Sequence, residues 1–397
     1  MNKAIGMLAV LAFTASAANA ELLKNFNYNG SVEAVGASVN NADFNSKNGD
    51  KNSDVRSRVT VNVGFDLNED VNAVVTAVKD NRQYGDAPAN NTSESAQDVQ
   101  DNVYFDQAYL NLKGVFGIDS KIGRQYFGDK DSIVIYYGPQ DWTVRNFGVK
   151  ANHLDYALDG WTGNWKQDKW SASAMVAKAE EAGASDVDLY GVTAAYDYSD
   201  IVKPSVYYYE SKDYLGARTD DLQIAGVKAN GEYKGVKYNA EYAMNMGQLN
   251  PGTAVGSQYR GYAVKANAGY GIDLAGKLDF SAEFAMGSGD KNTTDKKDKG
   301  FNDINANYRP GLIVGGVRGR TNLNNITTWN VGANWAPSKI EKLNLAAKYY
   351  DFSNTEKVAG VSRIGGEADL IATWNHSKSV AFNLGLGMLM PTKDYSK

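Results

Sequence analysis

The sequence predicts an all-β fold, a transmembrane antiparallel up-and-down β-barrel of about 18 strands. Three observations lead to this prediction. Apolar and polar residues alternate over segments of ten to fourteen residues, tight and long connections follow each other in turn, and a secretory leader precedes a chain without any long apolar run. Strands of soluble sandwiches are usually only about five or six residues long, so these segments are typical of membrane strands.

Residues 1–20 have the three parts of a secretory signal peptide. Lys3 gives a basic start, residues 4–13 form an apolar run, and Ala18-Asn19-Ala20 forms a small-x-small end. Cleavage after Ala20 would leave residues 21–397 as a single barrel domain, because no linker or change of composition divides them. The leader and the strands together predict the outer membrane of a Gram-negative-type bacterium, with its lipid as one partner.

Composition excludes several other classes of protein. The chain contains no cysteine, so a disulfide-stapled scaffold is excluded. Its formal net charge is −5, and a mildly acidic exported chain is not suited to binding nucleic acid.

The alternation is clearest in residues 54–67, DVRSRVTVNVGFDL, where Val59 and Val61 share one face and Arg58 and Asn62 share the other. The same pattern predicts seventeen strands: 26–39, 54–67, 71–83, 102–113, 117–127, 155–166, 169–180, 186–199, 202–213, 220–233, 235–247, 258–271, 275–287, 326–336, 341–352, 363–375 and 379–390.

An odd number of strands is unexpected for a barrel with both termini on the periplasmic side. We therefore expect an eighteenth strand, either missing after the last predicted strand or hidden in residues 311–319, GLIVGGVRG. A barrel of this width encloses an aqueous lumen unless loops fill it.

The alternation turns a set of charged residues toward that lumen. On the lipid face, an Arg or Lys at mid-plane costs roughly 2–4 kcal/mol. Two interpretations stay open: hydrated ion pairs that contribute little, or a transverse field that guides charged solutes. The inward set comprises Arg56, Arg58, Lys228, Lys237, Lys265, Lys348 and Arg363, with Asp66, Glu241, Asp279, Glu283, Glu367 and Asp369.

Motifs for catalysis and metal binding do not occur in the sequence. His153 and His376 are the two histidines, and no nucleophile motif accompanies His153 and its neighbour Asp155. We expect no enzyme, no cofactor and no metal site. Four aspartates in residues 287–303 lack the spacing of a calcium loop; they are Asp290, Asp295, Asp298 and Asp303.

Residues 122–150, IGRQYFGDKDSIVIYYGPQDWTVRNFGVK, resemble a signature of the alginate-export family of outer-membrane barrels. The sequence departs from the family pattern at Asp131 and Lys150, where arginines are expected, and lacks an aspartate between Phe147 and Gly148. The resemblance implies an eighteen-stranded pore with a basic constriction for acidic polysaccharide or other anionic solutes. It rests on Gly123-Arg124-Gln125, Gly128-Asp129, Trp142, Arg145, Phe147, Gly148 and Val149.

The orientation of Arg124 is open at this level. Strict alternation places it on the face of Ile118 and Ile122, whereas a bulge near Gly123 would turn it inward. We expect the connection 128–152 to fold into the lumen and form a constriction, and a bulge would turn Arg124 toward it. Its charged residues would be Arg124, Asp129, Asp141, Arg145 and Lys150.

These features favour a porin that admits small hydrophilic solutes by passive diffusion, with anionic or acidic-saccharide solutes as the narrower expectation. The alternative is a structural or adhesive surface barrel with a plugged lumen, which the long connection 287–325 favours. The oligomeric state, monomer or trimer, stays open.

Overall fold

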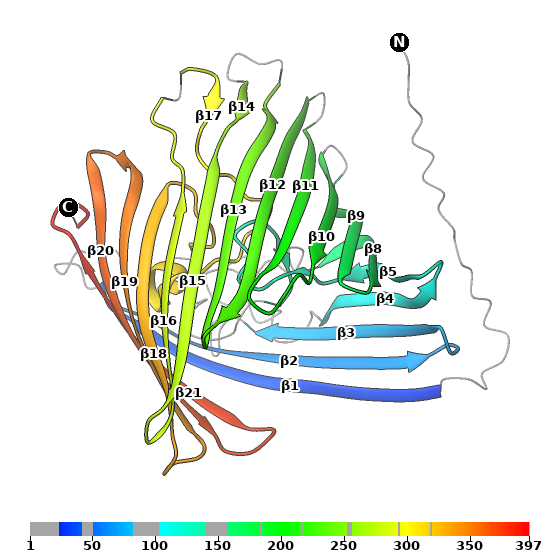
Figure 1. Ribbon diagram of the computed structural model, residues 1–397, viewed down its shortest axis with the longest axis horizontal. Coiled ribbons are helices and arrows are strands. Elements are labelled where there is room, and N and C mark those ends of the chain that lie inside the picture. Colours follow the sequence, from blue (N-terminus) through cyan, green and yellow to red (C-terminus); the bar gives the residue numbers. More distant parts are fainter. Residues whose placement is uncertain are drawn as a thin grey trace, which may run out of the picture.

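The computed structural model describes residues 24–41, 51–81, 103–139, 157–182, 185–215, 218–251, 256–292, 294–317 and 320–396. The predicted signal peptide lies outside these residues. The described chain forms one sheet of 19 strands, which curves round as Figure 1 shows. Two of the 19, β14 (Ser257–Tyr259) and β17 (Lys297–Asp298), are short pieces in long connections.

The other seventeen strands are long and form the wall. They are β1 (Lys24–Val39), β2 (Asn52–Asp66), β3 (Val71–Asn81), β4 (Val103–Val115), β5 (Ile118–Gln125), β8 (Leu158–Gln167), β9 (Trp170–Ala182), β10 (Ser185–Tyr196), β11 (Lys203–Leu215), β12 (Arg218–Tyr233), β13 (Val236–Leu249), β15 (Tyr262–Asp273), β16 (Gly276–Gly287), β18 (Ile326–Pro337), β19 (Leu343–Val358), β20 (Val361–Asn375) and β21 (Ala381–Pro391). A separate pair, β6 (Phe127–Gly128) and β7 (Tyr136–Tyr137), lies in the connection after β5.

Each long strand pairs antiparallel with its neighbours along the chain, which confirms the predicted all-β, up-and-down topology. Because the direction reverses at every step, β1 and β21 run the same way, and no pairing joins them among the described strands. The suggestion that residues 311–319 hide a strand is wrong. Gly311–Val317 form a π-helix, η3, whose first residue has a positive φ of 78°.

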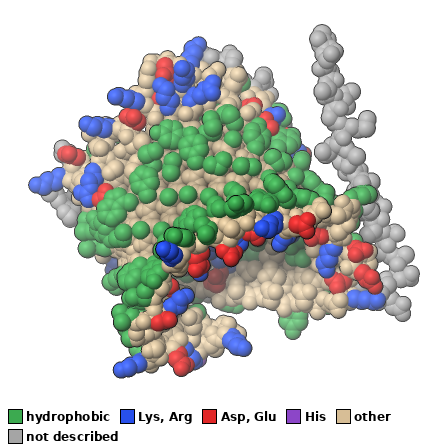
Figure 2. Space-filling view, in the orientation of Figure 1, with side chains coloured by type: hydrophobic (Ala, Val, Ile, Leu, Met, Phe, Trp, Pro, Cys, Tyr) green, Lys and Arg blue, Asp and Glu red, His purple; other side chains and the backbone are tan. Residues whose placement is uncertain are grey.

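The outer face carries the apolar residues of the alternation. Val192, Val206 and Val227 are about half exposed there, as expected for side chains that face lipid. Figure 2 shows hydrophobic side chains gathered in a broad band across the surface, with Lys, Arg, Asp and Glu gathered above and below it. Near the tight turns the band ends in aromatic residues, such as Trp170 and Tyr196, whose ring centroids are 4.4 Å apart.

The inner face departs from simple alternation in the half of the barrel next to the long connections. Met175, Leu189 and Ile224 point inward there and are at most 2% exposed. They belong to one hydrophobic cluster with Ile133 and Ile135 from the connection after β5. Burying each such side chain contributes roughly 1.5–3 kcal/mol, so the hydrophobic core of this chain lies inside the sheet, where loops meet the wall.

Among the described residues, no helix combines the length and the apolar character needed to cross a bilayer.

Candidate functional site: loops packed inside the barrel

Two segments that are far apart in the sequence lie together against the inner wall. They are residues 127–137 and 301–317, and we call them the inner-loop layer. The backbone N–H of Tyr136 donates to the carbonyl of Asn305 at 2.7 Å, and the Ile304 N–H donates to the Val134 carbonyl at 3.0 Å. These bonds make a short parallel contact between the segments, with Ile135 opposite Asn305.

Asparagine side chains extend this contact between the two segments. The Asn305 amide donates to the carbonyl of Tyr136 at 2.9 Å, and the Asn307 amide donates to that of Lys130 at 2.7 Å. An asparagine amide satisfies a backbone carbonyl that has no strand partner, which allows irregular backbone to be buried. The sequence NDINANYRP was a signal for this role that the prediction did not use.

A charged row crosses the inner wall beneath the layer. Lys228 on β12, Glu241 on β13 and Lys265 on β15 are register partners on adjacent strands. Glu241 is 6% exposed, lies 3.5 Å from the Lys228 ammonium and accepts a hydrogen bond from the Tyr207 hydroxyl at 2.7 Å. A carboxylate so deeply buried is stable only with such partners. Tyr207 was not among the predicted site residues.

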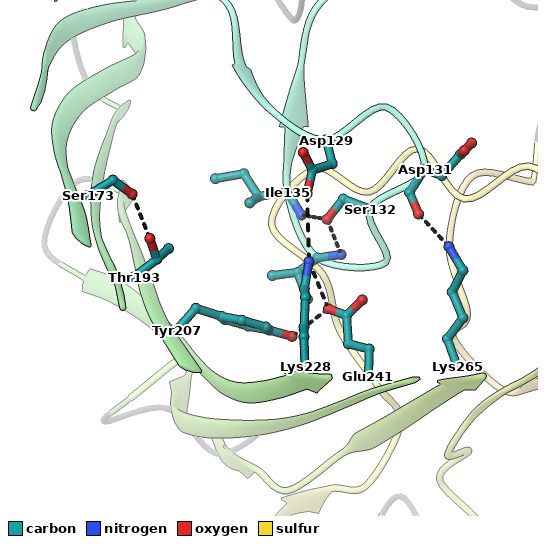
Figure 3. Close-up of polar contacts among 11 residues, drawn as sticks. Asp129, Asp131, Ser132, Ile135, Ser173, Thr193, Tyr207, Lys228, Glu241 and Lys265 are labelled. Carbon is teal, nitrogen blue, oxygen red and sulfur yellow. Dashed lines mark hydrogen bonds and ion pairs between the residues drawn. The ribbon is translucent and has the colours of Figure 1, made fainter. Parts of the chain in front are cut away.

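Both lysines of this row hold residues 127–137 to the wall, as Figure 3 shows. The Lys265 ammonium donates to the backbone carbonyl of Asp131 at 2.8 Å, and Lys228 lies 3.9 Å from the Asp129 carboxylate. The Asp129 side chain is 88% exposed, and Lys130 is also exposed. The layer therefore presents a tip of alternating charge, Asp129-Lys130-Asp131, to solvent.

Tyr308 connects the second segment to the same wall. Its ring lies 5.1 Å below the Lys265 ammonium, a cation–π contact, and its hydroxyl donates to Glu283 on β16 at 2.8 Å. The Asn330 amide donates to the same Glu283 oxygen at 3.1 Å. Lys265 thus contacts both segments of the layer at once.

Glu367 and Asp369 on β20 hold the π-helix η3. Glu367 is fully buried and accepts the backbone N–H groups of Ile313 at 2.6 Å and Val314 at 3.0 Å, while Asp369 accepts that of Leu312 at 2.9 Å. These N–H groups have no intrahelical partner at a helix start, and a carboxylate is their strongest acceptor. The acids therefore position a loop.

Three other predicted residues also lie on the inner face. Arg58 is 7% exposed and pairs with Glu33 on β1, with Nε and Nη2 both 2.7 Å from Oε2. Lys237 shares a face of β13 with Glu241, and Lys348 shares a face of β19 with Tyr350; both lysines are exposed.

Arg124 does not face the lumen. Its partners Ala108 and Asp159 follow in unbroken register, so β5 has no bulge at Gly123, although that residue has a φ of 120°. Its neighbour Gln125 is buried inward, and the Arg124 Nη1 lies 2.9 Å from the Asp159 carboxylate on the opposite face. The expected inward orientation of Arg124, which a role in the constriction requires, is therefore wrong, because the side chain faces outward.

Arg124 begins a row of charges whose signs alternate across neighbouring strands on the outer face. Asp188 belongs to this row, and it lies eight residues from Tyr196, at the other end of the apolar band, on the same face of β10. At about 3.4 Å per residue and a tilt near 40°, this spacing is roughly 20 Å, close to the height of a membrane-facing band. The row therefore marks the outer edge of the apolar surface. The members of the row, each the register partner of the next on the neighbouring strand, are Arg124, Asp159, Lys178, Asp188, Lys212 and Asp221.

Arg363 also differs from its expected orientation. Phe352 is opposite Gly365 whereas Ser353 is opposite Arg363, so one extra residue, Ile364, is inserted in β20. The buried side chain of Ile364 takes the inward position, and Arg363 forms an ion pair with Asp351 on the outer face. A bulge shifts the alternation by one residue, so the side chains beyond it point to the face opposite to the one that strict alternation predicts.

Several predictions fall outside the described part of the chain. The constriction residues Asp141, Arg145 and Lys150 lie there, as does His153, and the side chain of Arg56 is not described. His376 lies at the turn after β20, with its ring 6.5 Å from that of Phe382. Within the described ranges, no group of three His, Cys, Asp or Glu residues is arranged to hold a metal ion.

Comparison with known proteins agrees with this architecture. Solved Pseudomonas aeruginosa structures share the fold: OccK11 (OpdR) at 12% identity and TM-score 0.58, covering 93% of this chain and 92% of that one, and OccK5 (OpdH) at 10% and 0.58, covering 93% and 94%. OccK2 (OpdF), solved in complex with glucuronate, matches at 9% and 0.56, covering 94% of each. No curated protein matches the sequence. The family model described as alginate export matches residues 26–393, and the chain therefore belongs to the alginate export family.

Proposed function

We propose that the chain forms an outer-membrane channel through which small hydrophilic solutes diffuse passively, in a lumen narrowed by the inner-loop layer. One observation carries the proposal. The layer is held against several strands at once, by Lys228, Lys265 and Glu367, while its charged tip stays exposed to solvent. Fixed irregular backbone inside a barrel narrows the pore without adding flexible chain to it.

Anionic solutes, including acidic saccharides, are the class that we propose for this channel. The family is described as alginate export, and one structural relative was solved with glucuronate. Lys237 and Lys348 are exposed on the inner face and would attract such solutes. The acids Asp129 and Asp131 at the tip oppose this attraction, so we expect weak anion selectivity.

Planar-bilayer recordings test this function. The purified chain should give ion-conducting openings, and a salt gradient should give a reversal potential on the anion-selective side. Preparations that contain folded barrel but give no openings would contradict the channel. Openings with a cation-selective reversal potential would leave the channel intact and contradict the solute class.

A second candidate is a surface barrel whose lumen is plugged. The hydrogen bonds between residues 127–137 and 301–317 favour it, because they join the two segments into one unit inside the barrel. Liposome swelling in neutral sugars distinguishes the two functions. A channel admits small sugars and the liposomes swell, whereas a plugged barrel gives the swelling rate of protein-free liposomes.

A further inference from the structure

A cavity of about 550 Å³ lies between the inner-loop layer and the ends of β19–β21. Its lining is mixed: Val314, Val361, Ile364 and Leu389 supply apolar side chains, and Asn354 and Tyr395 supply polar ones. Small-molecule sites commonly have volumes of roughly 300–1,000 Å³, with apolar walls and a few polar groups that fix orientation. The cavity has the size and lining of such a site.

Arg320 supplies the cationic group of this cavity. Within the described part of the chain, its guanidinium donates to one carbonyl, that of Asn324, at 3.3 Å from Nη1 and 3.5 Å from Nη2. Burial lowers the pKa of Arg320, and the ionisable group that opposes this effect is the phenol of Tyr395, which also lines the cavity. Burial thus removes water from the guanidinium, and no carboxylate of the described residues compensates its charge.

Asp394 is the acid in the lining, but it does not fill this role. It is exposed, it has interactions of its own, and it is not among the groups that shift the pKa of Arg320. A desolvated cation without a counter-charge is unfavourable, and an incoming anion would remove that cost. The planar fork of a guanidinium matches a carboxylate, to which it can donate two parallel hydrogen bonds.

We propose that this cavity binds a small monocarboxylate with an apolar body, whose carboxylate pairs with Arg320 and whose body packs against Val361, Ile364 and Leu389. A sugar acid binds less well there, because the hydroxyl groups that lie against Val361, Ile364 and Leu389 lose water without gaining a partner. Val314 joins this site to the pore, since its side chain lines the cavity and its N–H is held by Glu367. The inference does not depend on the channel function proposed above.

Titration of the full purified chain in detergent tests the site, with 3-phenylpropionate as probe and its uncharged amide as the matched ligand. We expect saturable binding of the acid and at least tenfold weaker binding of the amide. Glucuronate should also bind at least tenfold more weakly than the acid. Equal affinity for acid and amide, or no binding of the acid, would overturn the proposal without any variant. Equal affinity for glucuronate and the acid would overturn the proposal that the ligand has an apolar body.

Variants then locate the binding. Arg320→Gln should reduce the affinity for the acid to that for the amide, and Arg320→Lys should restore part of it. Lys357→Gln is the matched control, because Lys357 is an exposed cation near the end of β19 that does not line the cavity. Full affinity in Arg320→Gln, or an equal loss in Lys357→Gln, would place the binding elsewhere. A far-UV melting curve for each variant verifies that the barrel is folded.

Discussion

The Lys265 ammonium on the inner wall of β15 donates a hydrogen bond to the backbone carbonyl of Asp131, 134 residues earlier in the chain. Lys265 is 7% exposed, and its ammonium also lies over the ring of Tyr308. One wall residue therefore contacts both segments of the inner-loop layer. If the layer sets the width of the lumen, that width depends on this side chain.

Lys265→Met should loosen the layer while retaining the apolar stem of the lysine. A hydrogen bond from a charged group contributes roughly 1.5–3 kcal/mol, so we expect a lower free energy of unfolding by about this amount. Single-channel recordings should show a larger or less steady conductance. Lys378→Met is the control, because this exposed lysine lies in the turn between β20 and β21. Identical recordings from both variants and the wild type would refute a role for Lys265.

Ion selectivity should follow the exposed tip of the layer. A unit charge about 7 Å from a passing ion in water contributes roughly 0.6 kcal/mol, which is close to RT. Screening by salt reduces this to roughly 0.25 kcal/mol, and anions and cations respond in opposite senses. Asp129→Asn should therefore raise the anion-to-cation permeability ratio about twofold, and Lys130→Gln, at the exposed tip, should lower it by a similar factor. Arg124→Gln should leave the reversal potential unchanged, since its guanidinium faces outward beside Asp159. A shift in Arg124→Gln as large as in Asp129→Asn would contradict this arrangement.

The wall could be predicted from sequence because the alternation of side chains along a strand is a local property. The seventeen predicted strands have counterparts in the seventeen long strands of the sheet. Orientation could not be predicted where the alternation is interrupted. Gly123 suggested a bulge but has none, whereas the bulge at Ile364, next to Gly365, was not predicted and turned Arg363 outward.

The pairing of residues 127–137 with 301–317 in the inner-loop layer could not be predicted, since it depends on contacts between distant segments. Asn305 and Tyr136 are 169 residues apart, and Asn307 and Lys130 are 177 apart. Alternation identified Glu367 as inward-facing, but it gave no indication that the carboxylate would accept backbone N–H groups from a π-helix. Charged side chains such as Lys265 and Glu367 were predicted to line the water-filled lumen, and instead they hold loops to the wall.

Glu367→Gln should release the start of η3. The carboxylate accepts one N–H on each oxygen, from Ile313 and Val314. A glutamine amide offers one oxygen and places its nitrogen against the second N–H, which leaves a buried donor unsatisfied at a cost of about 1–3 kcal/mol. Hydrogen exchange at residues 312–314 should become faster by roughly tenfold or more.

The control for this substitution is Asp279→Asn, which removes the charge of an inner-face carboxylate on β16 that pairs with Lys277 instead of a loop. Exchange at residues 312–314 should be unchanged in that variant. Unchanged exchange in Glu367→Gln itself would show that the carboxylate does not hold the helix.

The inner-loop layer should be more stable in mild acid. Burial raises the pKa of Asp303 to about 6, although hydrogen bonds from the backbone N–H of Ala306 and from Asn322 favour its charged form. The ordinary value is 3.8, so between these two values the folded state holds a proton that the unfolded state has released. Stability is then greatest below about pH 4, falls as the pH rises to about 6, and is constant above that.

From pH 7 to pH 5 this difference amounts to roughly 1.3 kcal/mol, or about a tenfold change in local opening. Hydrogen exchange at residues 304–307, corrected for the intrinsic rate, should therefore slow about tenfold in the wild type. Asp303→Asn retains an acceptor for the Ala306 N–H but does not titrate, so its protection should not change with pH. Asp290→Asn, outside the layer, should behave as the wild type. A parallel pH response in Asp303→Asn and the wild type would assign the effect to another group.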